Sequence, residues 1–185
     1  FTSVAHWGET GQGTWTLNVS DGASGDTGYL RDWDLTFFGD AITGDDTYIF
    51  TDQWARYGGE ASRQTLTDTL GVDTLNFASI TQTLDLDLTP GSTNSLLGHA
   101  LNIAAGSVFE NVYGGDAGDV ISGNDADNLL YGMRGDDVLS GGSGSDVLMG
   151  GAGDDVLAGG SGQDTARYSG NYADYSVTLS GAELA

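Results

Sequence analysis

The chain of 185 residues carries 27 acidic and five basic residues, which give a formal net charge of −22 at pH 7. This charge excludes nucleic acid as a partner, because phosphate binding needs a basic surface, and it equally disfavours binding to anionic membranes. The sequence has no cysteine and no apolar run long enough to span a bilayer, so we expect neither disulfides nor membrane insertion.

Two strands are predicted near the start of the chain. Thr14–Val19 and Trp33–Phe38 alternate apolar and polar residues, and Ser20–Gly28 between them is rich in turn-forming residues. Two or three strands cannot bury a core of their own, so we expect their partners to lie elsewhere. Because the sequence begins at Phe1 without a methionine or a signal peptide, we also expect it to be a piece of a longer protein.

The motifs of this first segment resemble the end of the P-domain, the β-sandwich module that follows the catalytic domain of kexin-like subtilisins. The matching stretches are HWGE at residues 6–9, GTWTL at residues 13–17 and WDLTF at residues 33–37. The resemblance covers only the last part of that module. It implies that residues 1–40 are the C-terminal part of a jelly-roll-like P-domain. It also implies a partner, the upstream protease domain of the same polypeptide.

Short strands are predicted throughout residues 41–113. Strand patterns occur at Thr43–Asp52, Asp73–Phe77, Gln82–Leu88, Leu101–Ala104 and Val108–Tyr113. In the third of these, three leucines alternate with two aspartates, which predicts one buried and one exposed face.

Six nine-residue units then run without a gap from Gly114 to Arg167: GGDAGDVIS, GNDADNLLY, GMRGDDVLS, GGSGSDVLM, GGAGDDVLA and GGSGQDTAR. Their consensus, G-G-x-G-x-D-x-U-x with U a large aliphatic residue, is typical of a calcium-loaded parallel β-roll. Six residues of each unit are expected to form a turn and three a strand, so that two units make one coil. A flexible Gly/Asp-rich linker is the alternative, but a linker has no reason to keep an aliphatic residue at position 8 in five units of six.

The turns predict a calcium site. We expect glycines at positions 1, 2 and 4 to adopt positive φ and to point carbonyl oxygens inward, while position 6 adds a carboxylate. These are the hard oxygen ligands that Ca²⁺ prefers. The predicted metal-binding residues occupy positions 1, 3, 5 and 6, of which positions 3 and 5 are expected to use their carbonyls. They are Gly114, Asp116, Gly118, Asp119, Gly123, Asp125, Asp127, Asn128, Gly132, Arg134, Asp136, Asp137, Gly141, Ser143, Ser145, Asp146, Gly150, Ala152, Asp154, Asp155, Gly159, Ser161, Gln163 and Asp164.

Turns should stack every second unit, which predicts about four bridging ions between stacked sixth positions. The two predicted stacks are Asp119–Asp137–Asp155 and Asn128–Asp146–Asp164. The Asn128 site is expected to be the weakest, because an amide replaces a carboxylate there, and Asp127 beside it is a candidate to compensate. Six further acids lie in turn-like contexts, as either calcium ligands or solvated surface groups: Asp45, Asp46, Asp52, Asp73, Asp116 and Asp125.

The predicted core of the roll is thin. It holds one residue per unit, at position 8, and each aliphatic side chain contributes about 1.5–3 kcal/mol on burial. The same segment contains ten aspartates, which repel one another. We therefore expect residues 114–167 to be unfolded without Ca²⁺ and to fold on binding it.

Residues 71–131 resemble the segment that leads into the calcium roll of RTX proteins, namely serralysin-type secreted proteases. The matching stretches are DTLNF, TLDLDLTPGS, LNIAAGSVFENVYGGDAGDVISGN and DNLLYG. The resemblance implies that residues 41–113 are a linker and a capping β-sandwich segment. Residues 168–185 likewise resemble the closing strand, or C-terminal cap, of such rolls.

No catalytic residue is predicted within this chain. The two histidines, His6 and His99, lack an H-E-x-x-H or subtilisin context, so both are interpreted as structural. The expected fold is all-β: a parallel β-roll capped by a β-sandwich segment, with a partial P-domain at the N-terminus.

The two resemblances together imply the calcium-binding C-terminal region of a secreted bacterial subtilisin/kexin-like serine endopeptidase. Its expected role is calcium-dependent folding, stability and type I secretion, with the type I secretion apparatus as a transient partner. Two alternatives are open, the tail of a serralysin-like metalloprotease and a non-enzymatic adhesin or binding module.

Overall fold

The computed structural model describes residues 44–169 of the chain. The chain divides into two compact units, residues 1–43 and residues 44–185. The predicted P-domain strands, His6 and the predicted closing strand at residues 175–179 lie outside the described residues. Among the residues that are described, no helix is long and apolar enough to cross a membrane.

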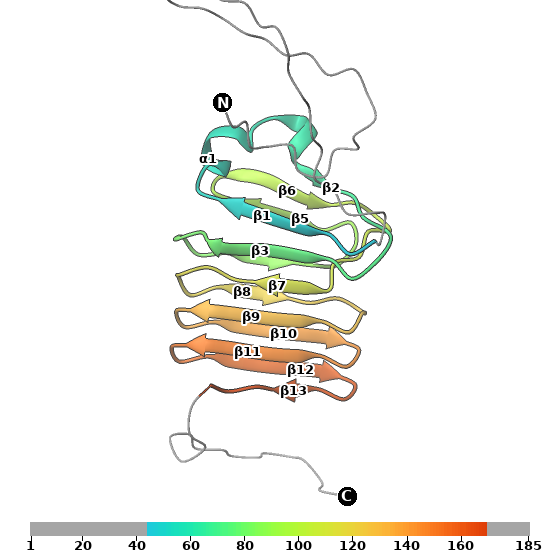
Figure 1. Cartoon of the computed structure of the whole chain (residues 1–185), viewed down its shortest axis with the longest axis vertical. Coiled ribbons are helices and arrows are strands. Elements are labelled where there is room, and N and C mark those ends of the chain that lie inside the picture. The colour runs from blue at the N-terminus through green and yellow to red at the C-terminus, as the bar shows by residue number, and fades with distance from the viewer. Residues whose placement is uncertain (1–43, 170–185) are drawn as a thin grey trace, which may run out of the picture. The chain divides into compact units, whose positions relative to one another are not determined.

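Two β-sheets face each other as the walls of a flattened roll (Figure 1). The first sheet has six strands, all paired in parallel. In spatial order they are β1 (Thr47–Thr51), β3 (Thr74–Ser79), β7 (Asn111–Tyr113), β9 (Leu129–Arg134), β11 (Val147–Ala152) and β13 (Thr165–Ala166). The second sheet has seven strands, in the order β12 (Val156–Ser161), β10 (Val138–Ser143), β8 (Val120–Ser122), β4 (Asp85–Asp87), β5 (Thr93–Leu96), β6 (His99–Ile103) and β2 (Thr65–Leu66).

The strand register confirms the predicted coil of two units. In the second sheet Val120 lies beside Val138, and Val138 beside Val156. In the first sheet Leu129 lies beside Val147. Each step is eighteen residues along the chain (138 − 120 = 18). Every turn therefore stacks on the turn two units away.

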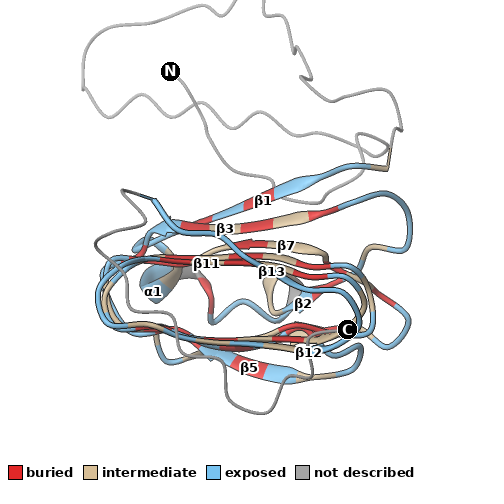
Figure 2. Cartoon of the chain, turned by 90° about the horizontal axis from the view of Figure 1, so that it is seen from below, coloured by how far each residue is buried: buried red, intermediate tan, exposed pale blue. Residues whose placement is uncertain are grey.

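The core lies between the two sheets, whose strands carry the buried residues (Figure 2). In the repeats it consists of the position-8 residues, of which Ile121, Leu130 and Leu139 are fully buried and Leu148 is 2% exposed. Leu157, in the last complete coil, is only half-buried. The predicted single row of aliphatic residues is therefore confirmed, and it loosens toward the C-terminal end.

The interior at the other end of the roll is aromatic. Phe50 stacks on Phe77 with ring centroids 4.6 Å apart, and Tyr48 meets Phe109 edge-on at 5.5 Å. Aromatic rings bury far more apolar area than a row of single leucines. The segment before the repeats therefore contributes the larger part of the hydrophobic core.

The segment predicted to cap the roll continues both of its walls. Strands β3 and β7 extend the first sheet in parallel, and β4 extends the second sheet beside β8. Leu84, Leu86 and Leu88 are buried, and the two aspartates that alternate with them are exposed, as predicted. The β5–β6 hairpin then pairs antiparallel with β4. The sequence patterns did not predict β2, β5 or two short helices, α1 (Trp54–Tyr57) and a 3-10 turn at Ala61–Arg63.

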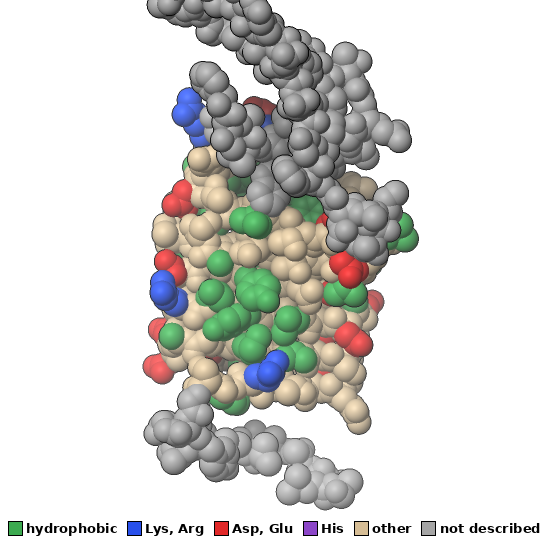
Figure 3. Space-filling model, viewed as in Figure 1, with side chains coloured by type: hydrophobic (Ala, Val, Ile, Leu, Met, Phe, Trp, Pro, Cys, Tyr) green, Lys and Arg blue, Asp and Glu red, His purple; other side chains and the backbone are tan. Residues whose placement is uncertain are grey.

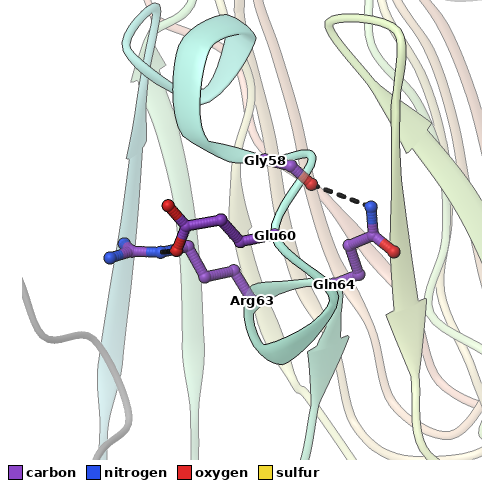
Figure 4. Close-up of polar contacts among 4 residues, drawn as sticks. All are labelled: Gly58, Glu60, Arg63 and Gln64. Carbon is purple, nitrogen blue, oxygen red and sulfur yellow. Dashed lines mark hydrogen bonds and ion pairs between the residues drawn. The ribbon is translucent and has the colours of Figure 1, made fainter.

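Two polar contacts fix the loop between α1 and β2 (Figure 4). The Arg63 guanidinium pairs with the Glu60 carboxylate at 2.8 Å, and Gln64 Nε2 donates to the carbonyl of Gly58 at 2.9 Å. The loop leads into β2, which pairs with β6 at the end of the second sheet. The two-residue strand β2 is therefore the edge strand of the second sheet at this end.

Two neighbouring positions test which side chains hold the walls together. Replacing Leu139, which is fully buried, with alanine should lower the free energy of unfolding by about 2–5 kcal/mol because it leaves a cavity in a thin core. Val138→Ala is the matched control, since the Val138 side chain is 44% exposed. Urea unfolding in the presence of calcium measures both. Equal losses from the two variants would contradict the assignment of inner and outer faces.

Candidate calcium-binding turns

The turns of the repeats stack along two edges of the roll. On the first edge, where the chain passes from the first sheet to the second, the position-6 carboxylates form a ladder. Asp137 Oδ1 accepts the main-chain N–H of Asp119 at 2.8 Å, and Asp155 Oδ1 accepts that of Asp137 at 3.0 Å. Each carboxylate thus binds the turn one coil before it.

The second edge repeats this arrangement. Asp146 Oδ1 accepts the N–H of Asn128 at 2.8 Å, and Asp164 Oδ1 accepts that of Asp146 at 3.1 Å. These hydrogen bonds join the same residues that the repeat pattern predicts to stack. They use one oxygen of each carboxylate and leave the other for a different partner.

Two of these carboxylates are buried with one oxygen unpaired. Asp137 and Asp146 are both 0% exposed, and neither Oδ2 atom has a hydrogen-bond partner. A buried carboxylate oxygen without a partner is strongly destabilising. Asp119 differs, because its Oδ1 accepts from Leu84 N–H at 2.8 Å and its Oδ2 from Gly115 N–H at 2.7 Å. Within the repeats, the demand for a cation is therefore strongest in the third and fourth units.

The unpaired oxygens face carbonyl groups of the next coil. A β-carbon placed on Gly132 would contact both Asp137 Oδ2 and, at 2.7 Å, the carbonyl oxygen of Gly150. A β-carbon on Gly141 would contact Asp146 Oδ2 and a glycine carbonyl oxygen in the same way. A carboxylate oxygen and a carbonyl oxygen that lie this near each other repel unless a cation neutralises them. Ca²⁺, which takes oxygen ligands, fits this arrangement.

The glycines of the turns serve two purposes, and this corrects one expectation. Positions 2 and 4 adopt positive φ, as predicted, in the last four units, where even Met133 at position 2 has φ 83°. The position-1 glycines of these units do not adopt positive φ. They are required instead because the position-6 carboxylate occupies the space of a β-carbon. The first two units contain no residue with positive φ, so their turns are of a different shape.

Side chains at positions 3 and 5 lie on the outer rim of the turns. Arg134 pairs with Asp116 one coil away at 2.8 Å, with both side chains largely exposed. Asp136 Oδ1 accepts the N–H of Asp154, and Asp127 Oδ1 accepts the N–H of Ser145. Among the other residues predicted at these positions, Asp125, Ser145, Ala152, Ser161 and Gln163 are also exposed, whereas Gly118 and Ser143 are half-buried.

The ladder of the second edge extends beyond the repeats. Asp46, Asp73 and Glu110 stand directly before β1, β3 and β7, in register with Asn128 before β9. Asp73 Oδ1 accepts the N–H of Asp46 at 2.8 Å, and Glu110 Oε2 accepts that of Asp73 at 2.7 Å. Glu110 is not among the residues that the sequence pattern predicts. An acid placed directly before a first-sheet strand is the signal that could have identified it.

A second candidate metal site lies at this end. One carboxylate oxygen from each of Asp46, Asp68 and Asp73 lies within 4.8 Å of the others. Asp73 is 0% exposed and its Oδ2 has no hydrogen-bond partner. Asp68 is fixed by Tyr48, whose hydroxyl donates to its Oδ2 at 2.8 Å. Asp68 has no sequence motif that would have marked it, because it lies in a loop.

The electrostatics of both regions favour a bound positive charge. Burial, together with neighbouring carboxylates, raises the pKa of Asp73 to about 6 and that of Asp137 to about 6. Burial likewise raises the pKa of Asp119 and of Asp146. Each shift means that the negative charge is unfavourable in the folded chain unless something compensates it.

One histidine can be placed in the structure. His99 Nε2 lies 3.0 Å from the carbonyl oxygen of Ala55, so the ring joins β6 to helix α1. This contact agrees with the structural role expected for it.

Comparison with known families assigns the two ends of the chain. Residues 113–148 and 135–166 match the RTX calcium-binding nonapeptide repeat, and residues 1–37 match the proprotein convertase P-domain. The roll is therefore built from RTX calcium-binding repeats, and P-domain sequence precedes it in the same chain. Over 53 residues the chain is 43% identical to Kexin from Candida albicans (strain WO-1). That stretch is 27% of this chain and 6% of the Kexin sequence.

The raised pKa values predict an unusual dependence of stability on pH. Between the ordinary carboxyl pKa and the folded value of about 6, the folded chain binds protons that the unfolded chain releases. The metal-free chain should therefore become more stable as the pH falls from about 7 to about 5. Calcium affinity should fall over the same interval, because protons compete for the carboxylates. The folded fraction in a chelator, followed by far-ultraviolet circular dichroism, and calcium titrations at matched pH values measure both trends. Metal-free stability that falls with acidification would contradict the assignment.

Proposed function

We propose that this chain is the calcium-binding C-terminal region of a secreted bacterial serine endopeptidase of the subtilisin/kexin type. One observation carries the calcium part of the proposal. In turns that match RTX repeats, the buried Asp137 and Asp146 carboxylates each hold an unpaired oxygen against a glycine carbonyl. A bound Ca²⁺ would convert this repulsion into coordination.

The ions would lie between stacked turns. On the first edge one ion would lie between Asp119 and Asp137 and the next between Asp137 and Asp155. On the second edge the Asn128, Asp146 and Asp164 turns would hold two more. The carboxylates of position 6 and the carbonyls of positions 1, 3 and 5 would be the ligands. Ca²⁺ is bound by such sets of six to eight oxygens.

A further ion is proposed at the other end of the second edge. Asp46, Asp68 and Asp73 would supply carboxylates. Glu110 would hold the main chain of Asp73 in place by accepting its N–H. This site would neutralise the acids around the aromatic core. The part of the roll before the repeats would then also be stabilised by calcium.

The role we propose for calcium is to time folding. Ligand that binds only the folded state stabilises it by mass action. Calcium is scarce inside cells and abundant outside, so the repeats would stay unfolded for passage through the type I secretion apparatus and fold on arrival. The acidic, cysteine-free composition supports this, since metal then replaces disulfides as the stabilising link.

The protease assignment rests on the P-domain. Residues 1–37 match that family, and Kexin shares the stretch of 43% identity. Residues 1–40 would therefore join the roll to an upstream protease domain of the same polypeptide. A metalloprotease tail would not be expected to carry P-domain sequence.

Residues 168–185 are proposed to close the C-terminal end of the roll. Leu157 is only half-buried, and a hollow of about 800 Å³ borders it together with Tyr168 and Ser169. The edges of β12 and β13 are also the last in their sheets. Terminal coils of solenoids need a cap, and the alternating residues at 175–179 suit one.

Ion counting by native mass spectrometry, combined with far-ultraviolet circular dichroism, tests the proposal. The unaltered chain should gain β-structure on calcium addition. Asp137→Asn, Asp146→Asn and Asp73→Asn should each bind fewer ions, because a neutral amide removes the charge that needs compensation. In a chelator the same variants should be no less folded than the unaltered chain.

Asp136→Asn is the matched control, since Asp136 adjoins Asp137 but its carboxylate faces the rim. It should bind the full number of ions. Full β-structure of the unaltered chain in excess chelator would rule out calcium-triggered folding. Equal ion counts for Asp136→Asn and Asp137→Asn would rule out the proposed ligand set.

A further inference from the structure

One position on the second edge replaces an acid with an amide. The residues directly before the first-sheet strands form a single column, because those strands are in register. From one end of the roll to the other, the column is Asp46, Asp73, Glu110, Asn128, Asp146 and Asp164. Asn128 is the amide, and its side chain is buried, with the residue 2% exposed.

The hydrogen bonds change direction at this residue. Elsewhere in the column an acid accepts the N–H of the residue one coil before it, as Asp73 does from Asp46 and Asp146 does from Asn128. Asn128 does the opposite. Its Nδ2 donates to the carbonyl oxygen of Glu110 at 3.1 Å, while the N–H of Glu110 donates to the carbonyl of Asp73 at 3.2 Å.

The amide nitrogen is surrounded by oxygens. Besides Glu110 O, Asn128 Nδ2 lies 3.2 Å from Asn124 Oδ1 and 3.5 Å from the carbonyl oxygen of Phe109. The orientation of the amide is fixed, because Asn128 Oδ1 accepts the N–H of Asn124 at 2.9 Å. An uncharged nitrogen thus occupies an oxygen-lined position of the kind that Ca²⁺ takes elsewhere.

Two acids of the column show what the amide avoids. Asp146, one position after Asn128, and Asp73, two positions before it, each keep an unpaired buried Oδ2. Asn124 and Asn128 satisfy each other and the surrounding carbonyls, with Asn124 Nδ2 donating to Phe109 O at 2.9 Å. This junction is complete without an ion.

We infer that the Asn128 amide takes the place of a cation and divides the second edge into two separate groups of ion sites. One group, at Asp46, Asp68 and Asp73, serves the aromatic end of the roll. The other serves the repeats from Asp146 onward. The inference rests on the proposed calcium binding of both groups. It makes Asn128 the residue that sets how many ions this edge holds.

Asn128→Asp in the full chain tests this directly. A carboxylate there would face three acceptor oxygens, and only a bound cation could relieve the repulsion. The variant should bind one ion more than the unaltered chain in excess calcium, counted by native mass spectrometry. Because it needs this extra ion, the variant should require a higher calcium concentration than the unaltered chain to reach full β-structure in circular dichroism. Asp146→Asn, the reverse exchange one coil away, is the control and should bind one ion fewer.

Several results would overturn the inference. An unchanged ion count with tighter binding would show that the new carboxylate only strengthens the site shared with Asp146. An Asn128→Asp chain that stays unfolded at saturating calcium would show that no cation can replace the amide. An unaltered chain that binds no calcium at all would contradict the proposed function, and this inference with it.

Discussion

The buried position-6 carboxylate, as in Asp137 and Asp146, is the group on which the roll depends. One of its oxygens accepts a main-chain N–H from the preceding coil and so fixes the distance and register between coils. The other oxygen is left inside the protein beside a carbonyl group. The carboxylate that joins one coil to the next by a hydrogen bond is therefore also the group that needs a cation. A core of one aliphatic residue per unit is too small to offset several uncompensated charges.

The position-6 carboxylate explains both why glycine is needed at position 1 and why acids occur in adjacent pairs. Gly132 and Gly141 are glycines because the carboxylate occupies the space of their β-carbon. In the acid pairs Asp136–Asp137 and Asp154–Asp155 the first side chain lies on the rim of the turn and the second points inward. Such neighbours do not converge on a common substrate, which agrees with a binding role for these turns.

Much of this could be predicted from the sequence, because the repeat has a fixed period. Nine residues per unit and an alternating strand define the coil, the buried row from Ile121 to Leu148 and the two stacks of turns. The roles of Asp68 and Glu110 could not be predicted, since they depend on how a long segment without repeats joins the same sheets. Nor could the direction of the Asn128 amide, which is set by the main-chain N–H of Asn124 together with the carbonyl of Glu110. The strand prediction at Leu101–Ala104 overlaps β6, but its hairpin partner β5 was missed because that strand is short and polar.

Amide hydrogen exchange measured with and without calcium tests the central claim most directly. The main-chain N–H groups of Asn128, Asp137 and Asp146 donate to position-6 carboxylates. If those carboxylates need calcium, these amides and the strands β10 to β12 should be protected in calcium and exchange at the rate of an unfolded chain in chelator. Equal protection in both conditions would contradict the account.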